Sequence, residues 1–153
     1  MTNGQDRMSA EDGLLEVWER AFLAGTSWRP SLHAGMSAMA RLLHEDPQAA
    51  ERCPLIGLAP MGERATDLAI EREQSRDRVL EVLHQQWAKC HEAPAPSLYF
   101  EVFIGEMASL VHQRLTADGD YDDLAQAAVS MWGPDRVRNA NPRTAATARP
   151  AVN

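Results

Sequence analysis

The chain has 153 residues, the usual size of a single domain and enough to bury a core of its own. Its net charge of −7 and its single lysine, Lys89, argue against direct nucleic-acid binding, because phosphate contacts need an excess of basic residues. The N-terminal residues are polar, and no apolar run approaches the roughly 18 residues of a membrane span, so we expect a cytoplasmic protein without membrane contact.

The two ends of the chain, Met1–Asp12 and Arg138–Asn153, predict disorder, because they are polar and almost free of large apolar residues. Between them, residues 13–137 are expected to form one domain. Apolar residues recur there at helical spacing, period-two alternation is absent, and β-branched residues are scarce. These patterns predict an all-α protein, a bundle of about six helices.

Three helices are expected in the N-terminal half. Gly13–Ala24 carries a crowded apolar face. Ser31–Glu45 has the clearest amphipathic pattern, with Pro30 suited to its first turn and a cap at Ser27 or the residue before it. A short helix, Gln48–Arg52, is expected to follow, because the next proline must bend or end it.

A long helix is expected at Glu63–Cys90, and its two halves differ in character. The first half is rich in charges of both signs and predicts a solvent-exposed surface. The second half has a face of spacing i, i+3/i+4 that predicts burial. This face consists of Val79, Val82, Leu83, Gln86, Trp87 and Cys90.

The last two helices are expected at Leu98–Leu115 and Tyr121–Trp132. The apolar residues of the first of them span about half of its circumference, whereas a helix resting on one side of a core needs a stripe only a little over ~100° wide. So wide an arc requires two neighbours. The helix is therefore either central within the protomer or packed between the core and a second subunit, and spacing alone leaves both open.

One segment, WRPSLHAGMSAMARLLHEDPQAAERC, resembles the opening of the C-terminal domain of TetR/AcrR transcriptional regulators. The matching positions are Trp28, Leu32, Ala34, Gly35, Leu42, Leu43, Asp46, Pro47, Ala49 and Ala50. Leu15–Phe22 is similar to the linker helix of that family, and Phe103–Leu115 to its penultimate helix. Met131 to Pro134 lie where the last helix of the family ends. The resemblance covers residues 13–137 as a pattern of helix lengths and punctuation.

This resemblance implies a TetR C-terminal-like helical bundle that binds a small hydrophobic or aromatic effector and dimerises. Mostly polar residues precede Gly13, so we expect the domain to lack the DNA-binding helix-turn-helix of the family. Two alternatives remain open. One is a helical adaptor that heterodimerises with an intact regulator, and the other is a small all-α enzyme.

The resemblance also implies an apolar ligand pocket between three of the expected helices. Large, flexible or aromatic side chains are typical of such a lining, and Tyr99 or His33 would supply an orienting hydrogen bond. The same residues would otherwise simply fill the core. The expected lining is His33, Met36, Met39, Leu43, Leu83, Trp87, Tyr99, Phe103 and Leu110.

A homodimer is expected as well, with the last two helices of each protomer forming a four-helix interface. The candidate residues lie on the surplus edge of the wide apolar arc and on the small-residue face of the final helix. They are Ile104, Met107, Ala108, Val111, Leu115, Leu124, Ala128, Met131 and Trp132.

The chemistry-bearing residues form no known catalytic or metal-binding motif. His33 and His44 are about 16 Å apart on one helix, too far to share a metal ion. The sequence has no His-Glu-x-x-His, Cys-x-x-Cys or glycine-rich phosphate loop, and its two cysteines do not suggest a disulfide framework. We therefore expect no catalytic residue, no metal and no cofactor.

Overall fold

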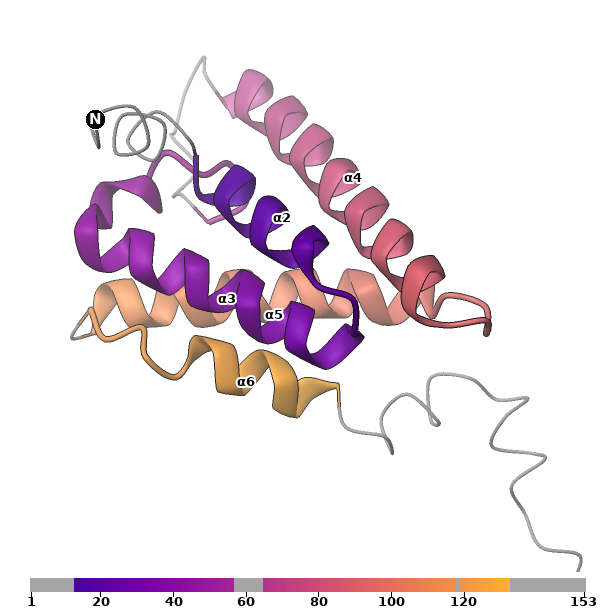
Figure 1. Ribbon diagram of the computed structural model, residues 1–153. Helices are drawn as coiled ribbons and strands as arrows, with labels where there is room; N and C mark the ends of the chain where they lie inside the picture. The colour runs from indigo at the N-terminus through magenta and orange to yellow at the C-terminus, as the bar shows by residue number, and fades with distance from the viewer. Residues whose placement is uncertain (1–12, 57–64, 118, 133–153) are drawn as a thin grey trace, which may run out of the picture.

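The computed structural model describes residues 13–56, 65–117 and 119–132, and within them it contains five α-helices, one short 3-10 helix and no strand. The all-α class is thereby confirmed for this part of the chain (Figure 1). The expected disordered ends, Met1–Asp12 and Arg138–Asn153, lie outside the described residues. The elements are α2 (Leu14–Ala24), α3 (Trp28–Glu45), η1 (Pro47–Ala49), α4 (Ala65–Cys90), α5 (Ser97–Thr116) and α6 (Leu124–Met131).

The helix boundaries differ from the expected ones at several ends. The short helix predicted at Gln48–Arg52 is instead the 3-10 helix Pro47–Ala49, because the proline favours its first position. Helix α3 begins three residues earlier than predicted, with Ser27 at the N-cap position. The Ser27 side chain makes no capping hydrogen bond. Instead, the hydroxyl of Ser31 donates to the backbone carbonyl of Ser27 at 2.6 Å.

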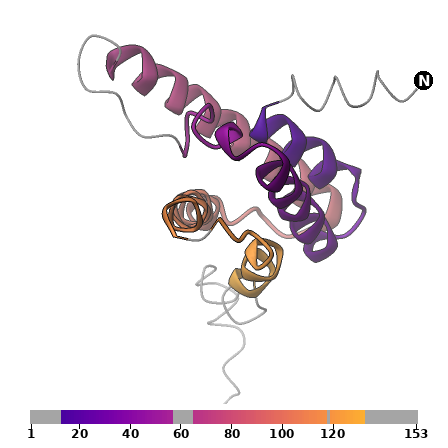
Figure 2. The same ribbon diagram turned by 90° about the vertical axis from the view of Figure 1, so that its left-hand side faces the viewer.

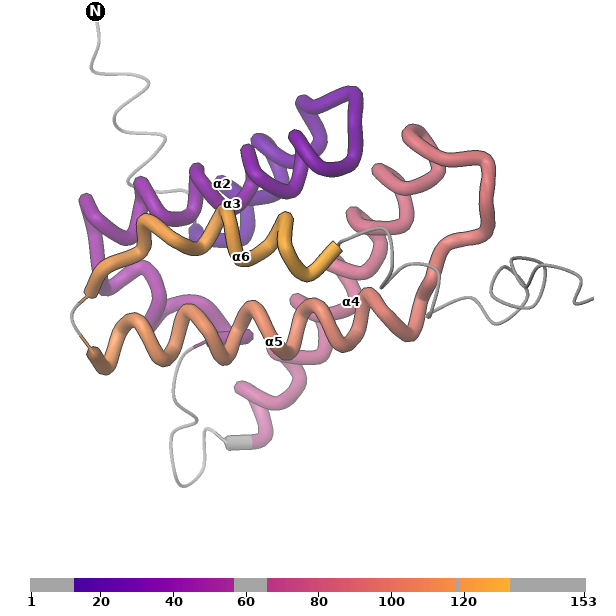
Figure 3. The backbone as a smooth tube through the Cα atoms, turned by 90° about the horizontal axis from the view of Figure 1, so that it is seen from below, coloured from indigo at the N-terminus to yellow at the C-terminus, as the bar shows by residue number. Residues whose placement is uncertain are grey.

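The bundle is built on an antiparallel pair, α2 and α3, with α6 antiparallel to α3 on its other side (Figure 1). Helix α5 runs antiparallel to α6, as Figure 3 shows from below. Close approach of α2 to α3 depends on Gly35. A Cβ atom there would lie 2.9 Å from the indole ring of Trp18 and 3.3 Å from Cβ of Phe22, so both side chains pack directly onto the backbone of α3.

An aromatic cluster closes the end of the bundle where the end of α2, the start of α3 and the end of α4 meet. Trp28 lies at its centre and is 7% exposed. Its ring centroid is between 5.0 and 5.9 Å from five other rings, which come from α2, α5 and the ends of α4 and α6. These rings belong to Phe22, Trp87, His91, Phe100 and Trp132.

Polar contacts, buried at Gln86 and exposed at Lys89, connect the second half of α4 to the turn between α2 and α3. Gln86 is fully buried, and its Nε2 donates to the carbonyl of Gly25 and to the hydroxyl of Ser31, both at 2.8 Å. Lys89 Nζ donates to the carbonyls of Leu23 and Gly25 at 3.2 and 3.0 Å. These donors satisfy carbonyls that the end of α2 leaves without helical partners.

The first half of α4 projects beyond the bundle, as Figure 2 shows from the side. From Thr66 to Arg78 no residue is buried, whereas Val79, Val82, Leu83, Gln86 and Trp87 are all buried in the second half. The predicted contrast between the two halves is therefore confirmed. None of the described helices combines the length and apolar character that crossing a membrane requires.

Candidate functional site

A wholly apolar cavity of about 50 Å³ lies in the middle of the bundle, bounded by α2, α3, α4, α5 and the segment that follows η1. Three methionines and two aromatic rings contribute to its lining, which therefore combines adaptable and rigid side chains. Helices α2 and α3 contribute Leu15, Trp18, Met36 and Met39 to the lining, and α5 contributes Phe103, Ile104, Met107, Ala108 and Val111. Leu55 and Ile56 come from the segment after η1, and Val79 comes from α4.

The cavity is much smaller than the roughly 300–1,000 Å³ of a typical small-molecule pocket. A volume of about 50 Å³ admits only a few non-hydrogen atoms. Methionine side chains adjust their shape at low cost, but rotamer changes alone do not supply the missing volume. A larger ligand therefore requires the helices around the cavity to move.

Two surface grooves flank the first half of α4 and share lining residues with the cavity. The groove between α4 and α5 has about 530 Å³ and shares Leu55, Ile104 and Ala108 with the cavity. The groove between α2 and α4 has about 440 Å³ and shares Leu15, Trp18 and Val79. The same side chains thus face the cavity on one side and a groove on the other.

Polar contacts at the surface hold the first half of α4 in place. Arg72 Nε donates to the carbonyl of Pro54 at 2.8 Å, and Arg76 pairs with Glu101 of α5 at 3.4 Å. Arg78 pairs with Glu19 of α2 and, more weakly, with Glu81 of its own helix. The hydrogen bond that Arg78 donates to Glu19 raises the pKa of its guanidinium, which therefore stays protonated.

Three of the nine residues predicted to line a pocket do line the cavity, namely Met36, Met39 and Phe103. The structure places the other six outside this cavity. Leu43 and Leu83 are fully buried elsewhere in the core, and Leu110 is half-buried outside the cavity. Trp87 belongs to the aromatic cluster and donates its indole N–H to the carbonyl of Ala93 at 2.9 Å.

The two predicted hydrogen-bonding residues are also directed elsewhere. His33 is exposed, and its Nδ1 lies 3.4 Å from the hydroxyl of Ser37 one turn away. Tyr99 donates its hydroxyl hydrogen to the carbonyl of Met131 at 2.8 Å. The lining is wholly apolar, so a molecule in the cavity would meet only apolar surface.

The interface predicted for a homodimer is corrected by the structure. Six of its residues are buried within the protomer, which makes them unavailable to a partner: Ile104, Met107, Val111, Leu124, Ala128 and Trp132. Ala108, Leu115 and Met131 are half-buried against the same core. The wide apolar arc therefore arises because α5 is covered inside the protomer, and part of it lines the cavity.

Nine lining residues were not predicted to line a pocket. Four of them, Ile104, Met107, Ala108 and Val111, were expected in the dimer interface, and the other five were assigned to no site: Leu15, Trp18, Leu55, Ile56 and Val79. Leu15 and Trp18 share an i, i+3 face that the first predicted helix already displayed. Leu55 and Ile56 lie in irregular chain after Pro54, where no periodicity indicates which side chain points inward. The neighbouring thiol of Cys53 is buried, and burial raises its pKa, which makes it a weak nucleophile.

Comparison with protein-family models, with curated proteins and with solved structures found no match to this chain.

Proposed function

We propose that this chain is an effector-binding and dimerisation domain of the TetR/AcrR type, and that it binds a small hydrophobic or aromatic molecule in the apolar cavity, where the buried half of α4 begins at Val79. The observation that carries the proposal is the apolar cavity, which lies between helices from both halves of the chain and is lined by three methionines. Such a lining suits ligands of varied apolar shape.

Movement of α4 would supply the volume that the cavity lacks. None of residues 66–78 is buried, and the contacts of this segment include exposed ion pairs and a hydrogen bond from Arg72 to a carbonyl. Exposed ion pairs each contribute about 0–1 kcal/mol, so their loss adds little to the cost of displacing the segment. The cavity would then join one or both grooves, whose volumes lie within the range of ordinary ligand pockets.

Ligand binding would in this way shift α4 between two positions, which is the kind of two-state change that a regulator transmits to a partner. The ligand can shift this equilibrium only as far as it binds the open position more tightly than the closed one. A higher free-energy cost of opening therefore lowers the apparent affinity for the ligand.

A thermal-shift titration with benzene, indole and naphthalene tests the proposal. We expect at least one of them to raise the melting temperature of the chain, with a stabilisation that follows RT ln(1 + [L]/Kd). Ala108→Leu, which places a larger side chain where the cavity and the α4–α5 groove meet, should abolish the response. Ala88→Leu makes the same change at an exposed position of α4 and should leave it intact.

Two results would contradict ligand binding at this cavity. One is the absence of any stabilisation by all three compounds up to their solubility limits. The other is an equal response of Ala108→Leu and the unchanged chain, which would place the ligand elsewhere.

The dimerisation part of the proposal uses a face other than the predicted one. Leu98 and Val102 are one turn apart on α5 and are 76% and 47% exposed. Together with Ile70 they are the large apolar residues that the described chain leaves exposed. The same face would serve the alternative function, a helical adaptor that pairs with an intact regulator.

A further inference from the structure

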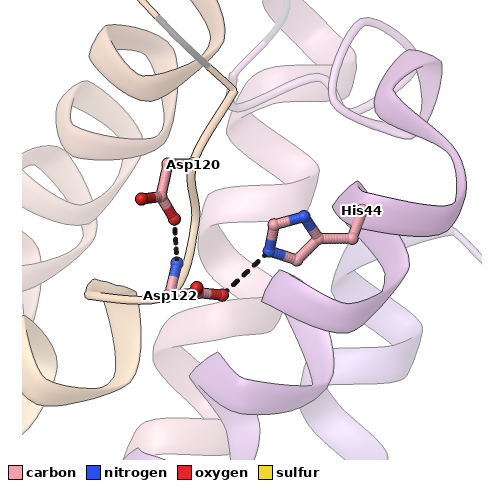
Figure 4. Close-up of side chains that lie close together, drawn as sticks. All are labelled: His44, Asp120 and Asp122. Carbon is pink, nitrogen blue, oxygen red and sulfur yellow. Dashed lines mark hydrogen bonds and ion pairs between the residues drawn. The ribbon is translucent and has the colours of Figure 1, made fainter.

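One imidazole and two carboxylates meet at the end of the bundle opposite the aromatic cluster (Figure 4). His44 lies in the last turn of α3, whereas Asp120 and Asp122 lie in the connection between α5 and α6. One donor atom from each residue lies within 4.8 Å of the other two. The fold creates this cluster, since His44 and Asp122 are 78 positions apart in the sequence.

Buried and hydrogen-bonded neighbours hold the three side chains in this arrangement. Tyr121, between the two aspartates, is 2% exposed, and its ring meets the His44 imidazole edge-on with centroids 5.4 Å apart. The backbone N–H of Asp122 donates to Oδ1 of Asp120 at 3.0 Å, which orients that carboxylate and leaves its other oxygen available. The connection is therefore anchored at the residue that separates the two donors.

Charge at the cluster is only partly balanced. His44 Nε2 lies 3.0 Å from Oδ1 of Asp122, and among the described residues this is the one ion pair that Asp122 forms. Arg114 is hydrogen-bonded to Asp123, with Nε 3.1 Å from Oδ1, and its positive charge also acts on Asp120 without a hydrogen bond to it. Two carboxylates thus face a single imidazole, an arrangement that a cation would stabilise.

We propose that His44, Asp120 and Asp122 bind one divalent transition-metal ion of the zinc class. A nitrogen and two carboxylate oxygens are donors that Zn²⁺ accepts at about 2.0–2.2 Å, and a fourth position would be left to water. The donor atoms must draw together for this, to separations of roughly 3.4 Å in tetrahedral geometry. All three side chains are exposed, so they can make this adjustment without disturbing the core.

The ion would join the end of α3 to the connection that leads into α6. Because the metal binds the folded chain through residues from two distant segments, it should stabilise the fold. Nε2 of His44 must give up its proton to coordinate the metal, so affinity should fall as the pH is lowered.

Isothermal titration of the full chain with ZnCl₂, after removal of metals with EDTA, tests this site. We expect one saturable site per chain in a non-chelating buffer at pH 7.5, and a melting temperature that rises with zinc. His44→Ala, Asp120→Asn and Asp122→Asn should each weaken binding by about tenfold or more, as loss of one ligand does. His33→Ala removes an exposed histidine from the same helix and should leave the affinity unchanged.

Circular dichroism of each variant establishes that it remains folded, which is expected because the substituted side chains are exposed. No saturable binding up to millimolar zinc would overturn the proposal. Zinc binding that is unaffected by His44→Ala would also overturn it. The same holds if the site binds Ca²⁺ through the two carboxylates and does not need the imidazole.

Discussion

At the scale of single residues, Gln86 makes buried polar contacts that join α4 to α3 and to the end of α2. It is fully buried on α4, where it donates to a carbonyl at the end of α2 and to a hydroxyl of α3. Its Oε1 is buried without a hydrogen-bond partner among the described atoms. The side chain is therefore held by its amide nitrogen alone, and it fixes the position of α4 relative to the turn between α2 and α3.

We expect Gln86→Ala to lower the free energy of unfolding by about 1–3 kcal/mol, because it removes two buried hydrogen bonds and leaves a small void. Gln85→Ala, at the adjacent exposed position, should change it by less than about 0.5 kcal/mol. Urea denaturation of the two variants measures both values. Equal stabilities would contradict the role assigned to Gln86.

Some of the residues predicted from the sequence to line a pocket do line the cavity and others do not, for reasons that differ from residue to residue. Met36, Met39 and Phe103 lie on regular helices whose apolar faces are evident from spacing. Tyr99 lies on such a helix too, but the hydrogen bond that its hydroxyl makes with Met131 depends on where α6 ends. The hydrogen-bond partner of a polar side chain depends on the tertiary structure, so it cannot be predicted from helical periodicity.

At the scale of helices, the contact between α2 and α3 is limited by the size of one residue. Gly35 lies where the rings of Trp18 and the Cβ of Phe22 approach the backbone of α3. Gly105, on α5, is in contrast open, and a Cβ atom there would meet no atom within 4 Å. These two glycines offer a matched comparison, since both lie inside helices.

Gly35→Ala should destabilise the chain by about 1–3 kcal/mol, because the new methyl group forces two packed aromatic side chains to shift. Gly105→Ala should stabilise it by about 0.5–1 kcal/mol through the higher helix propensity of alanine. Thermal or urea unfolding at low micromolar protein concentration shows whether each substitution raises or lowers the stability. A stabilising effect of Gly35→Ala would contradict the close packing of α2 on α3 at this residue.

Helix α5 illustrates what periodicity can and cannot reveal about an element. Its half-circumference apolar arc was evident in the sequence, but spacing measures only the width of an apolar face and not what covers it. The structure covers the arc with neighbouring helices of the same protomer, so Val111 is 1% exposed. Six of the nine residues predicted for the interface are therefore buried inside the chain, although the helix and its apolar face were predicted from the sequence.

At the scale of the whole molecule, the five helices produce three regions of different chemistry. An aromatic cluster closes one end, an apolar cavity lies in the middle, and His44 meets two aspartates at the other end. The all-α class followed from local patterns, whereas all three regions combine residues from distant parts of the chain. Sequence spacing could therefore indicate their members only in part.

Self-association is a property of this scale, and we expect the chain to be a dimer at tens of micromolar. The double change Leu98→Lys and Val102→Lys should yield a folded monomer, because it places two charges on the exposed apolar face of α5 without touching the core. Ala88→Lys, on the exposed side of α4, should remain dimeric. Light scattering coupled to size exclusion measures the mass of each, and a monomeric parent chain would contradict dimerisation through this face.

Hydrogen exchange followed by mass spectrometry tests most directly the claim that a ligand enters beneath a weakly held α4. Without ligand, amides of residues 66–78 should exchange about tenfold faster or more than those of residues 79–90, because only the second half is buried. The compound that stabilises the chain most should slow exchange in residues 66–78. Equal protection of the two halves, or a ligand effect confined to other helices, would contradict the account.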